Sequence, residues 1–169
     1  GQDGNIGGKT GTTDDAGYCF TAAYDRDGDE TYTVVLNSST TDQRFADTAA
    51  LANWYYGHKV TVAIANTQEK TANGNPLIAR ISQTDWTDKT IDATLADPAA
   101  QATIFSLAGE VTEKVAYDDL SGTVHVGDKV GSLTLKQDGI KVVVTDLVAD
   151  EEGSGPNPIE WLLVKLDRL

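Results

Sequence analysis

Several residue types are scarce in this chain of 169 residues. It has no methionine, three phenylalanines and a single cysteine, Cys19. One cysteine cannot form an internal disulfide, so no disulfide framework is expected, and its apolar neighbours predict a buried thiol. No run of about eighteen apolar residues occurs, and the N-terminus lacks the basic and apolar regions of a signal peptide. Because Gly1 opens directly into a glycine-rich stretch, we interpret the chain as a piece of a longer protein.

Basic residues are scarce as well. The chain has 13 lysines and arginines against 26 aspartates and glutamates, which gives a formal net charge of -13 and a pI of about 4.3. This excess of negative charge disfavours binding to nucleic acid and to anionic lipid surfaces. It predicts a strongly hydrated, acidic surface.

Glycine, threonine and valine are plentiful, and they occur in short runs that favour strands separated by turns. Three strands are predicted first, followed by a helix that starts at Thr41 or Asp42 and runs to Tyr56, with Gly57 ending it. The predicted strands are residues 6–13, 17–24, 31–36, 60–65, 77–81, 91–95, 103–107, 114–117, 133–136 and 140–147. The sequence therefore indicates a mainly β protein with one or two helices, an α+β arrangement.

These elements group into three parts. Residues 1–58 hold the strand-strand-strand-helix unit, and the short strands of residues 59–150 suit a small β-sandwich or barrel. Residues 151–169 begin as a Gly- and Pro-rich linker and continue as an amphipathic tail with an apolar helical stripe.

A glycine-rich Lys-Thr pair near the N-terminus is the most informative motif, and it has two interpretations. A phosphate-binding loop would need a glycine where Asp3 stands and a helix directly after the lysine; Gly11 and Gly17 follow instead. The other interpretation is the Lys-Thr-Gly strand of serine acyltransferases that act on penicillin-like substrates, in which an ammonium and a hydroxyl hold the substrate carboxylate.

A longer match favours the second interpretation. The matching stretches are Gly8-Lys9-Thr10-Gly11-Thr12-Thr13, Ala16-Gly17-Tyr18-Cys19, Arg26-Asp27-Gly28, Tyr32-Thr33-Val34-Val35-Leu36 and Leu51-Ala52-Asn53-Trp54. In this order and spacing they resemble the last part of the catalytic domain of the low-molecular-mass penicillin-binding D-alanyl-D-alanine carboxypeptidases. The stretch Val126-Gly127-Asp128-Lys129-Val130-Gly131-Ser132-Leu133 resembles the β-rich domain that follows it in these serine-type hydrolases. The first unit would then be a remnant of the penicillin-binding transpeptidase-like domain.

The resemblance implies roles for four residues. Lys9 would be the lysine of the family's third catalytic motif, and the backbone amide of Thr12 would contribute to the oxyanion hole. Thr10 would bind the carboxylate of the terminal D-alanine or of a β-lactam, with Gly11 and Thr12 completing the substrate-binding strand. No metal or other cofactor is implied.

The family nucleophile is the serine of a Ser-x-x-Lys motif, and a Ser-x-Asn motif completes the cleft. Neither motif occurs in this chain, whose serines are Ser38, Ser39, Ser82, Ser106, Ser121, Ser132 and Ser154. The nucleophile is therefore expected in a missing N-terminal part of the catalytic domain. The chain alone is expected to be inactive.

The resemblance also predicts partners and a location. It implies an extracytoplasmic enzyme of the cell envelope that acts on the peptidoglycan stem peptide and is trapped by β-lactams. A membrane anchor absent from this chain would follow the amphipathic tail. A non-catalytic binding or spacer module of the cell envelope is the alternative, and a β-lactamase-like acyltransferase is a weaker rival.

Overall fold

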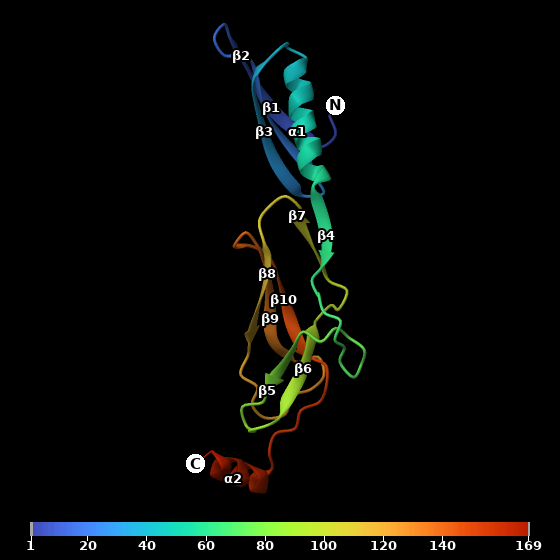
Figure 1. Cartoon of the computed structure of the whole chain (residues 1–169), viewed down its shortest axis with the longest axis vertical. Helices are drawn as coiled ribbons and strands as arrows, with labels where there is room; N and C mark the ends of the chain where they lie inside the picture. The colour runs from blue at the N-terminus through green and yellow to red at the C-terminus, as the bar shows by residue number, and fades with distance from the viewer. Residues whose placement is uncertain (1, 169) are drawn as a thin grey trace. The chain divides into compact units, whose positions relative to one another are not determined.

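The computed structural model describes residues 2 to 168 and contains two compact units, Gly1–Lys59 and Val60–Leu169 (Figure 1). Strands dominate both units, and two helices occur within the described residues. This confirms the predicted mainly β fold with one or two helices. The amphipathic tail belongs to the second unit.

The first unit is an antiparallel sheet with the strand order β1-β2-β3 and one helix. Its elements are β1 (Asn5–Thr13), β2 (Gly17–Arg26), β3 (Asp29–Ser38) and α1 (Gln43–Gly57). Asp27 and Gly28, both with positive φ, form the tight turn that joins β2 to β3. The predicted meander followed by a helix is confirmed.

Helix α1 covers one face of this sheet (Figure 1). The core on that face contains Phe20, Tyr24 and Ala52, and the ring of Phe20 meets the ring of Phe45 edge-on at 4.8 Å. Sheet residues alternate between faces, so every second residue of β3 points away from α1. Those residues are Tyr32, Val34 and Leu36, which are 68%, 57% and 71% exposed.

The start of α1 differs from the prediction. Neither Thr41 nor Asp42 caps the helix through its side chain; instead the hydroxyl of Thr40 accepts a hydrogen bond from the Gln43 amide at 3.0 Å. The chain already has helical backbone angles at Asp42, which leaves the capping role to a hydroxyl farther back.

Asp47 connects α1 to the end of β3. Its carboxylate accepts hydrogen bonds from the Gln43 side chain at 2.6 Å and from the Ser38 hydroxyl at 2.8 Å. These two bonds, the one from Gln43 first, hold the pKa of Asp47 below its usual value of 3.8. Ionised Asp47 therefore stabilises the folded state at pH values above the pKa that Asp47 has in the unfolded chain. This stabilisation is lost as the pH falls through the lower pKa that Asp47 has in the folded chain.

We expect Gln43→Ala to raise the pKa of Asp47 toward its usual value, because the main donor to the carboxylate is removed. A carbon-detected NMR titration of the Asp47 carboxyl measures this directly. Gln68→Ala, a glutamine outside this contact, serves as the control and should leave the titration unchanged. An unaltered Asp47 titration in Gln43→Ala would contradict the assignment.

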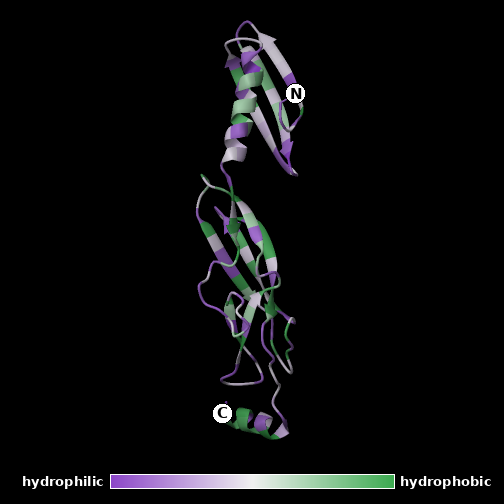
Figure 2. Cartoon of the chain, turned by 90° about the vertical axis from the view of Figure 1, so that its right-hand side faces the viewer, coloured by the Kyte–Doolittle hydropathy of each residue, from purple (hydrophilic) through white to green (hydrophobic). Residues whose placement is uncertain are grey.

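The second unit contains a five-stranded sheet with the order β5-β6-β10-β9-β8 and a two-stranded sheet of β4 and β7. Its strands are β4 (Lys59–Ala63), β5 (Ala79–Ser82), β6 (Thr90–Leu95), β7 (Gln101–Phe105), β8 (Val111–Tyr117), β9 (Lys129–Gln137) and β10 (Ile140–Ala149). Each strand predicted after Gly57 is present, although β9 starts four residues earlier than expected. In Figure 2, apolar and polar residues alternate along these strands, as half-buried sheets require.

The core of the second unit lies between its two sheets. Leu133, Leu147 and Leu95 of the larger sheet are fully buried. Ala102 joins the same cluster from β7 of the smaller sheet, and Ile64 joins it from the position directly after β4. The predicted β-sandwich or barrel is thus confirmed. No helix within residues 2 to 168 is both long enough and apolar enough to cross a membrane.

Helix α2 (Pro158–Asp167) follows the Gly- and Pro-rich segment. Asn157 caps it: its side-chain oxygen accepts hydrogen bonds from the amides of Ile159 and Glu160, at 2.9 and 3.0 Å, and Glu160 accepts one from the Asn157 amide at 2.8 Å. This reciprocal arrangement satisfies free donors at the helix start. The apolar stripe predicted at the end of the chain therefore lies on a capped helix.

Candidate functional site

The Lys-Thr-Gly motif lies on β1, an edge strand of the sheet in the first unit. Within residues 2 to 168 no strand pairs with its outer edge, so backbone N–H and C=O groups along that edge face outward. Lys9, Gly11 and Thr12 are exposed and Thr10 is half-buried. An extended peptide could add to this edge through backbone hydrogen bonds.

The strand register places the side chains of Lys9 and Thr10 on opposite faces of the sheet. Lys9 pairs with Thr21, which pairs with the exposed Val34; Thr10 pairs with Phe20, whose ring lies in the core under α1. The two residues nevertheless touch, because the Lys9 ammonium donates a hydrogen bond to the Thr10 carbonyl at 2.6 Å. Only a substrate lying along the edge, where both faces meet, could reach both side chains.

Two glycines of β1 have opposite surroundings. A Cβ at Gly8 would stand 2.5 Å from the Phe20 ring and 2.6 Å from the Thr21 carbonyl oxygen, so only glycine fits there. A Cβ at Gly11 would meet nothing within 4 Å. Gly8 thus permits the close approach of β1 and β2, whereas Gly11 leaves open space beside Lys9 on the same face.

Arg44 lies beside the candidate site, and the sequence did not single it out. Its side chain is only 8% exposed, and Nη1 donates a hydrogen bond to the Thr12 hydroxyl at 3.2 Å. The guanidinium also lies over the rings of Phe45 and Tyr18, at 5.0 and 5.9 Å from their centroids. Arg44 therefore connects α1 to the end of the Lys-Thr-Gly strand, next to the residue whose amide is predicted to serve the oxyanion hole.

Cys19 pairs with Gly11 and lies on the same face of the sheet as Lys9. The thiol is partly exposed, so the predicted full burial is wrong. It donates a hydrogen bond to the Ala16 carbonyl at 3.2 Å. This exposure follows from the open face of the sheet, which no element within residues 2 to 59 covers in the way that α1 covers the other face.

A complete catalytic group is not assembled by the described residues. Within residues 2 to 168, the Lys9 ammonium has a backbone carbonyl and no serine hydroxyl as its hydrogen-bond partner. The same part of the chain contains no group of three or more His, Cys, Asp or Glu side chains placed to hold a metal ion. The β1 edge thus presents one ammonium and open backbone groups, and within residues 2 to 168 no serine hydroxyl is bonded to that ammonium.

Comparison with known proteins gives one related curated sequence. No family model matches the chain. D-alanyl-D-alanine carboxypeptidase DacF of Bacillus subtilis (strain 168) is 25% identical over 149 residues, which cover 85% of this chain and 36% of that protein. The chain thus spans about a third of the length of its curated relative, in the C-terminal part. This match confirms the resemblance to D-alanyl-D-alanine carboxypeptidases.

Solved structures of proteins with related names also match. The D-alanyl-D-alanine carboxypeptidase DacD of Francisella tularensis gives a TM-score of 0.43 at 20% identity, covering 91% of this chain and 37% of that one. Penicillin-binding protein 5 of Haemophilus influenzae gives 0.47 at 18% identity, with 86% and 42% covered. A peptidoglycan synthesis regulatory factor (PBP3) of Streptococcus pneumoniae gives 0.47 at 21% identity, with 88% and 43% covered.

Proposed function

We propose that the chain is part of a serine-type D-alanyl-D-alanine carboxypeptidase, a hydrolase that removes the terminal D-alanine from peptidoglycan stem peptides through an acyl-enzyme. One observation carries the proposal: the Lys9-Thr10-Gly11 sequence lies on an exposed edge strand, within a chain related to the carboxypeptidase DacF over 149 residues. An exposed edge strand is where such a motif could line a cleft. β-Lactams would be trapped at the same site as a slowly hydrolysed ester.

The geometry of β1 supports a role for each motif residue. The Lys9 ammonium supplies positive charge at the strand edge, where it stabilises an anionic substrate and the developing oxyanion. The Thr10 hydroxyl binds the substrate carboxylate. Gly11 leaves room for the substrate to lie against the strand, and the Thr12 amide donates to the oxyanion. Arg44, bonded to the Thr12 hydroxyl, is a positioning residue that holds this end of the strand in place.

The nucleophilic serine belongs to a preceding part of the protein in this proposal. The uncovered face of the first sheet is consistent with such a partner, since Tyr32, Val34 and Leu36 form an apolar row that water contacts in the chain alone. The outer edge of β1 is open as well. We therefore infer that this preceding part of the protein packs on the uncovered face and brings its serine to Lys9. The 169-residue chain by itself would then not catalyse the reaction.

The proposed substrate places the protein outside the cytoplasm, at the cell wall. Membrane association is the finer part of this proposal. It is supported by α2, whose apolar side chains Ile159 and Leu162 are exposed. An anchor beyond this helix would hold the enzyme near its substrate.

Labelling with a fluorescent penicillin tests the proposed function. The 169-residue chain and the longer product of the same gene are incubated with the reagent, and the covalent adduct is identified by intact mass. We expect an adduct on the longer protein only, because the serine lies outside this chain. If a folded longer protein forms no adduct either, the β1 edge is not an active-site wall, and a non-catalytic envelope module becomes the better interpretation.

A further inference from the structure

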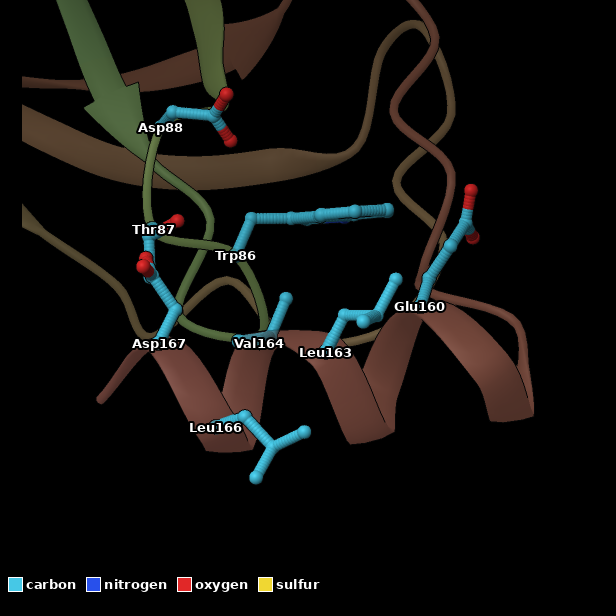
Figure 3. A pocket seen from close by; sticks show the side chains of 8 residues that line it. All are labelled: Trp86, Thr87, Asp88, Glu160, Leu163, Val164, Leu166 and Asp167. Atoms are coloured by element: carbon cyan, nitrogen blue, oxygen red, sulfur yellow. The ribbon is translucent and has the colours of Figure 1, made fainter. Parts of the chain in front are cut away.

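A groove in the second unit lies far along the chain from the Lys-Thr-Gly strand. It runs between the segment Trp86–Asp88 and helix α2 and has a volume of about 580 Å³, within the size range of small-molecule sites (Figure 3). The lining residues are Trp86, Thr87, Asp88, Glu160, Leu163, Val164, Leu166 and Asp167. Nothing in the proposed acyl transfer uses this groove.

Specific hydrogen bonds hold the two walls of the groove together. The Arg168 guanidinium donates to the Thr84 carbonyl at 2.6 Å and to the Trp86 carbonyl at 3.0 Å, which fixes the end of α2 to the loop. The indole N–H of Trp86 donates to the Ser154 carbonyl at 2.9 Å and so fixes the ring. Val164 is 9% exposed and is the buried contact of the helix. The groove is therefore built before any ligand arrives.

The lining combines an apolar floor with negative charge. Figure 3 shows the Trp86 ring above α2, with Leu163 and Val164 reaching toward it and the carboxylates of Glu160 and Asp167 near opposite ends of the helix. Asp88 adds a third carboxylate from the loop. Within residues 2 to 168, none of the three takes part in an ion pair.

The nearby basic groups form no ion pair with these carboxylates within residues 2 to 168. Arg168 is bound to backbone carbonyls, and the Lys165 ammonium lies 4.1 Å from the centroid of the Trp161 ring. The Lys89 ammonium lies 3.3 Å from the centroid of the Trp86 ring, and Lys89 is not one of the lining residues. The Trp86 ring thus already attracts a cation, and the carboxylates that line the groove are not paired with these basic groups.

We propose that this groove binds a small organic cation with an apolar body, such as an ammonium or guanidinium group on an aromatic or aliphatic stem. The stem lies against Trp86 and Leu163, where burial of apolar surface and the indole ring favour it. The cationic end is attracted by Asp88 and Asp167, whereas the Glu160 carboxylate accepts a hydrogen bond from the Asn157 amide. The proposal does not depend on the function proposed for the first unit.

Binding of phenethylammonium to the full 169-residue chain tests the proposal. Amide and indole resonances are followed by NMR at low ionic strength, with 3-phenylpropionate as the probe of opposite charge. We expect saturable shifts at Trp86 and along α2 with the cation and none with the anion. Added salt should weaken the binding, because exposed charges are screened.

Two double variants separate the groove from net charge. Asp88→Asn with Asp167→Asn should raise the dissociation constant about tenfold, the loss expected when two nearby carboxylates at the surface are neutralised. Asp167 lies at the C-terminal end of α2, where a negative charge opposes the helix dipole, so its replacement should not unfold the helix. Glu110→Gln with Asp119→Asn is the control: it also removes two negative charges, but at residues that do not line the groove, and it should leave the dissociation constant unchanged.

Three results would overturn the proposal. One is the absence of groove shifts with phenethylammonium, and another is equal binding of 3-phenylpropionate. The third is equal weakening in the control double variant, which would mean that the cation follows overall charge. If chitotriose shifts the same resonances and the cation does not, the groove is a carbohydrate site instead.

Discussion

Replacing Lys9 by alanine in the longer product of the gene is expected to lower the rate of acylation by penicillin about a hundredfold to a thousandfold. The ammonium lies at the open edge of β1, within hydrogen-bond distance of the Thr10 carbonyl, and in the proposed site it is the basic group that faces the substrate. Under that proposal, its loss removes positive charge where the substrate carboxylate is held and the oxyanion develops. Time courses of adduct formation, followed by intact mass, give the rate.

Lys114→Ala is the matched control for this experiment. Lys114 is an exposed lysine on β8 of the second unit, so its replacement changes the net charge equally and leaves the β1 edge untouched. We expect wild-type acylation in this variant. Wild-type acylation in Lys9→Ala, with the protein still folded by circular dichroism, would remove Lys9 from the proposed site.

The strands of both units could be predicted because their patterns are local. The alternation of Tyr32, Val34 and Leu36 correctly indicated a strand. It did not reveal that these residues lie on the exposed face, because burial depends on which segment covers the sheet, and α1 covers the other face. Turn residues such as Asp27 and Gly28 fixed the hairpin for a similarly local reason.

Arg44 shows the limit of pattern analysis at the candidate site. It lies one residue before Phe45 in the helix predicted to run to Tyr56, and an arginine is normally solvent-exposed. Its burial depends on Thr12, from a strand more than thirty residues earlier, and on the rings of Tyr18 and Phe45. Such a contact between distant segments has no periodic signal.

Asp150 illustrates the same limit in the second unit. The stretch Asn73-Gly74-Asn75-Pro76 has the composition of a turn, but its sequence does not show what holds that turn. Asp150, which is buried, accepts hydrogen bonds from the Thr71 hydroxyl and, at 2.9 Å, from the Asn75 side chain, and its carbonyl accepts one from Asn73 at 2.6 Å. Asp150 lies 75 to 79 residues from these partners, so no local sequence pattern indicates the polar network that they form in the folded chain.

Glycine-to-alanine replacements at two positions of β1 should separate folding from substrate binding. Gly8→Ala is expected to destabilise the first unit by about 1–3 kcal/mol, because the new Cβ would overlap the Phe20 ring and the Thr21 carbonyl oxygen. A backbone oxygen cannot rotate away as a side chain can, so β1 must move from β2. Hydrogen exchange of the β1 and β2 amides in the 169-residue chain measures the loss.

Gly11→Ala is the matched variant with the opposite expectation. Its Cβ meets no atom within 4 Å, so hydrogen exchange of β1 and β2 should stay close to that of the unchanged chain. In the longer protein the added methyl group would stand beside Lys9, where the substrate is proposed to lie, and a misplacement of this size should slow acylation by at least about tenfold. A loss of stability cannot be mistaken for this result, because it would appear as faster hydrogen exchange, which is measured separately from acylation. Unimpaired acylation in Gly11→Ala would show that the substrate does not lie along this strand.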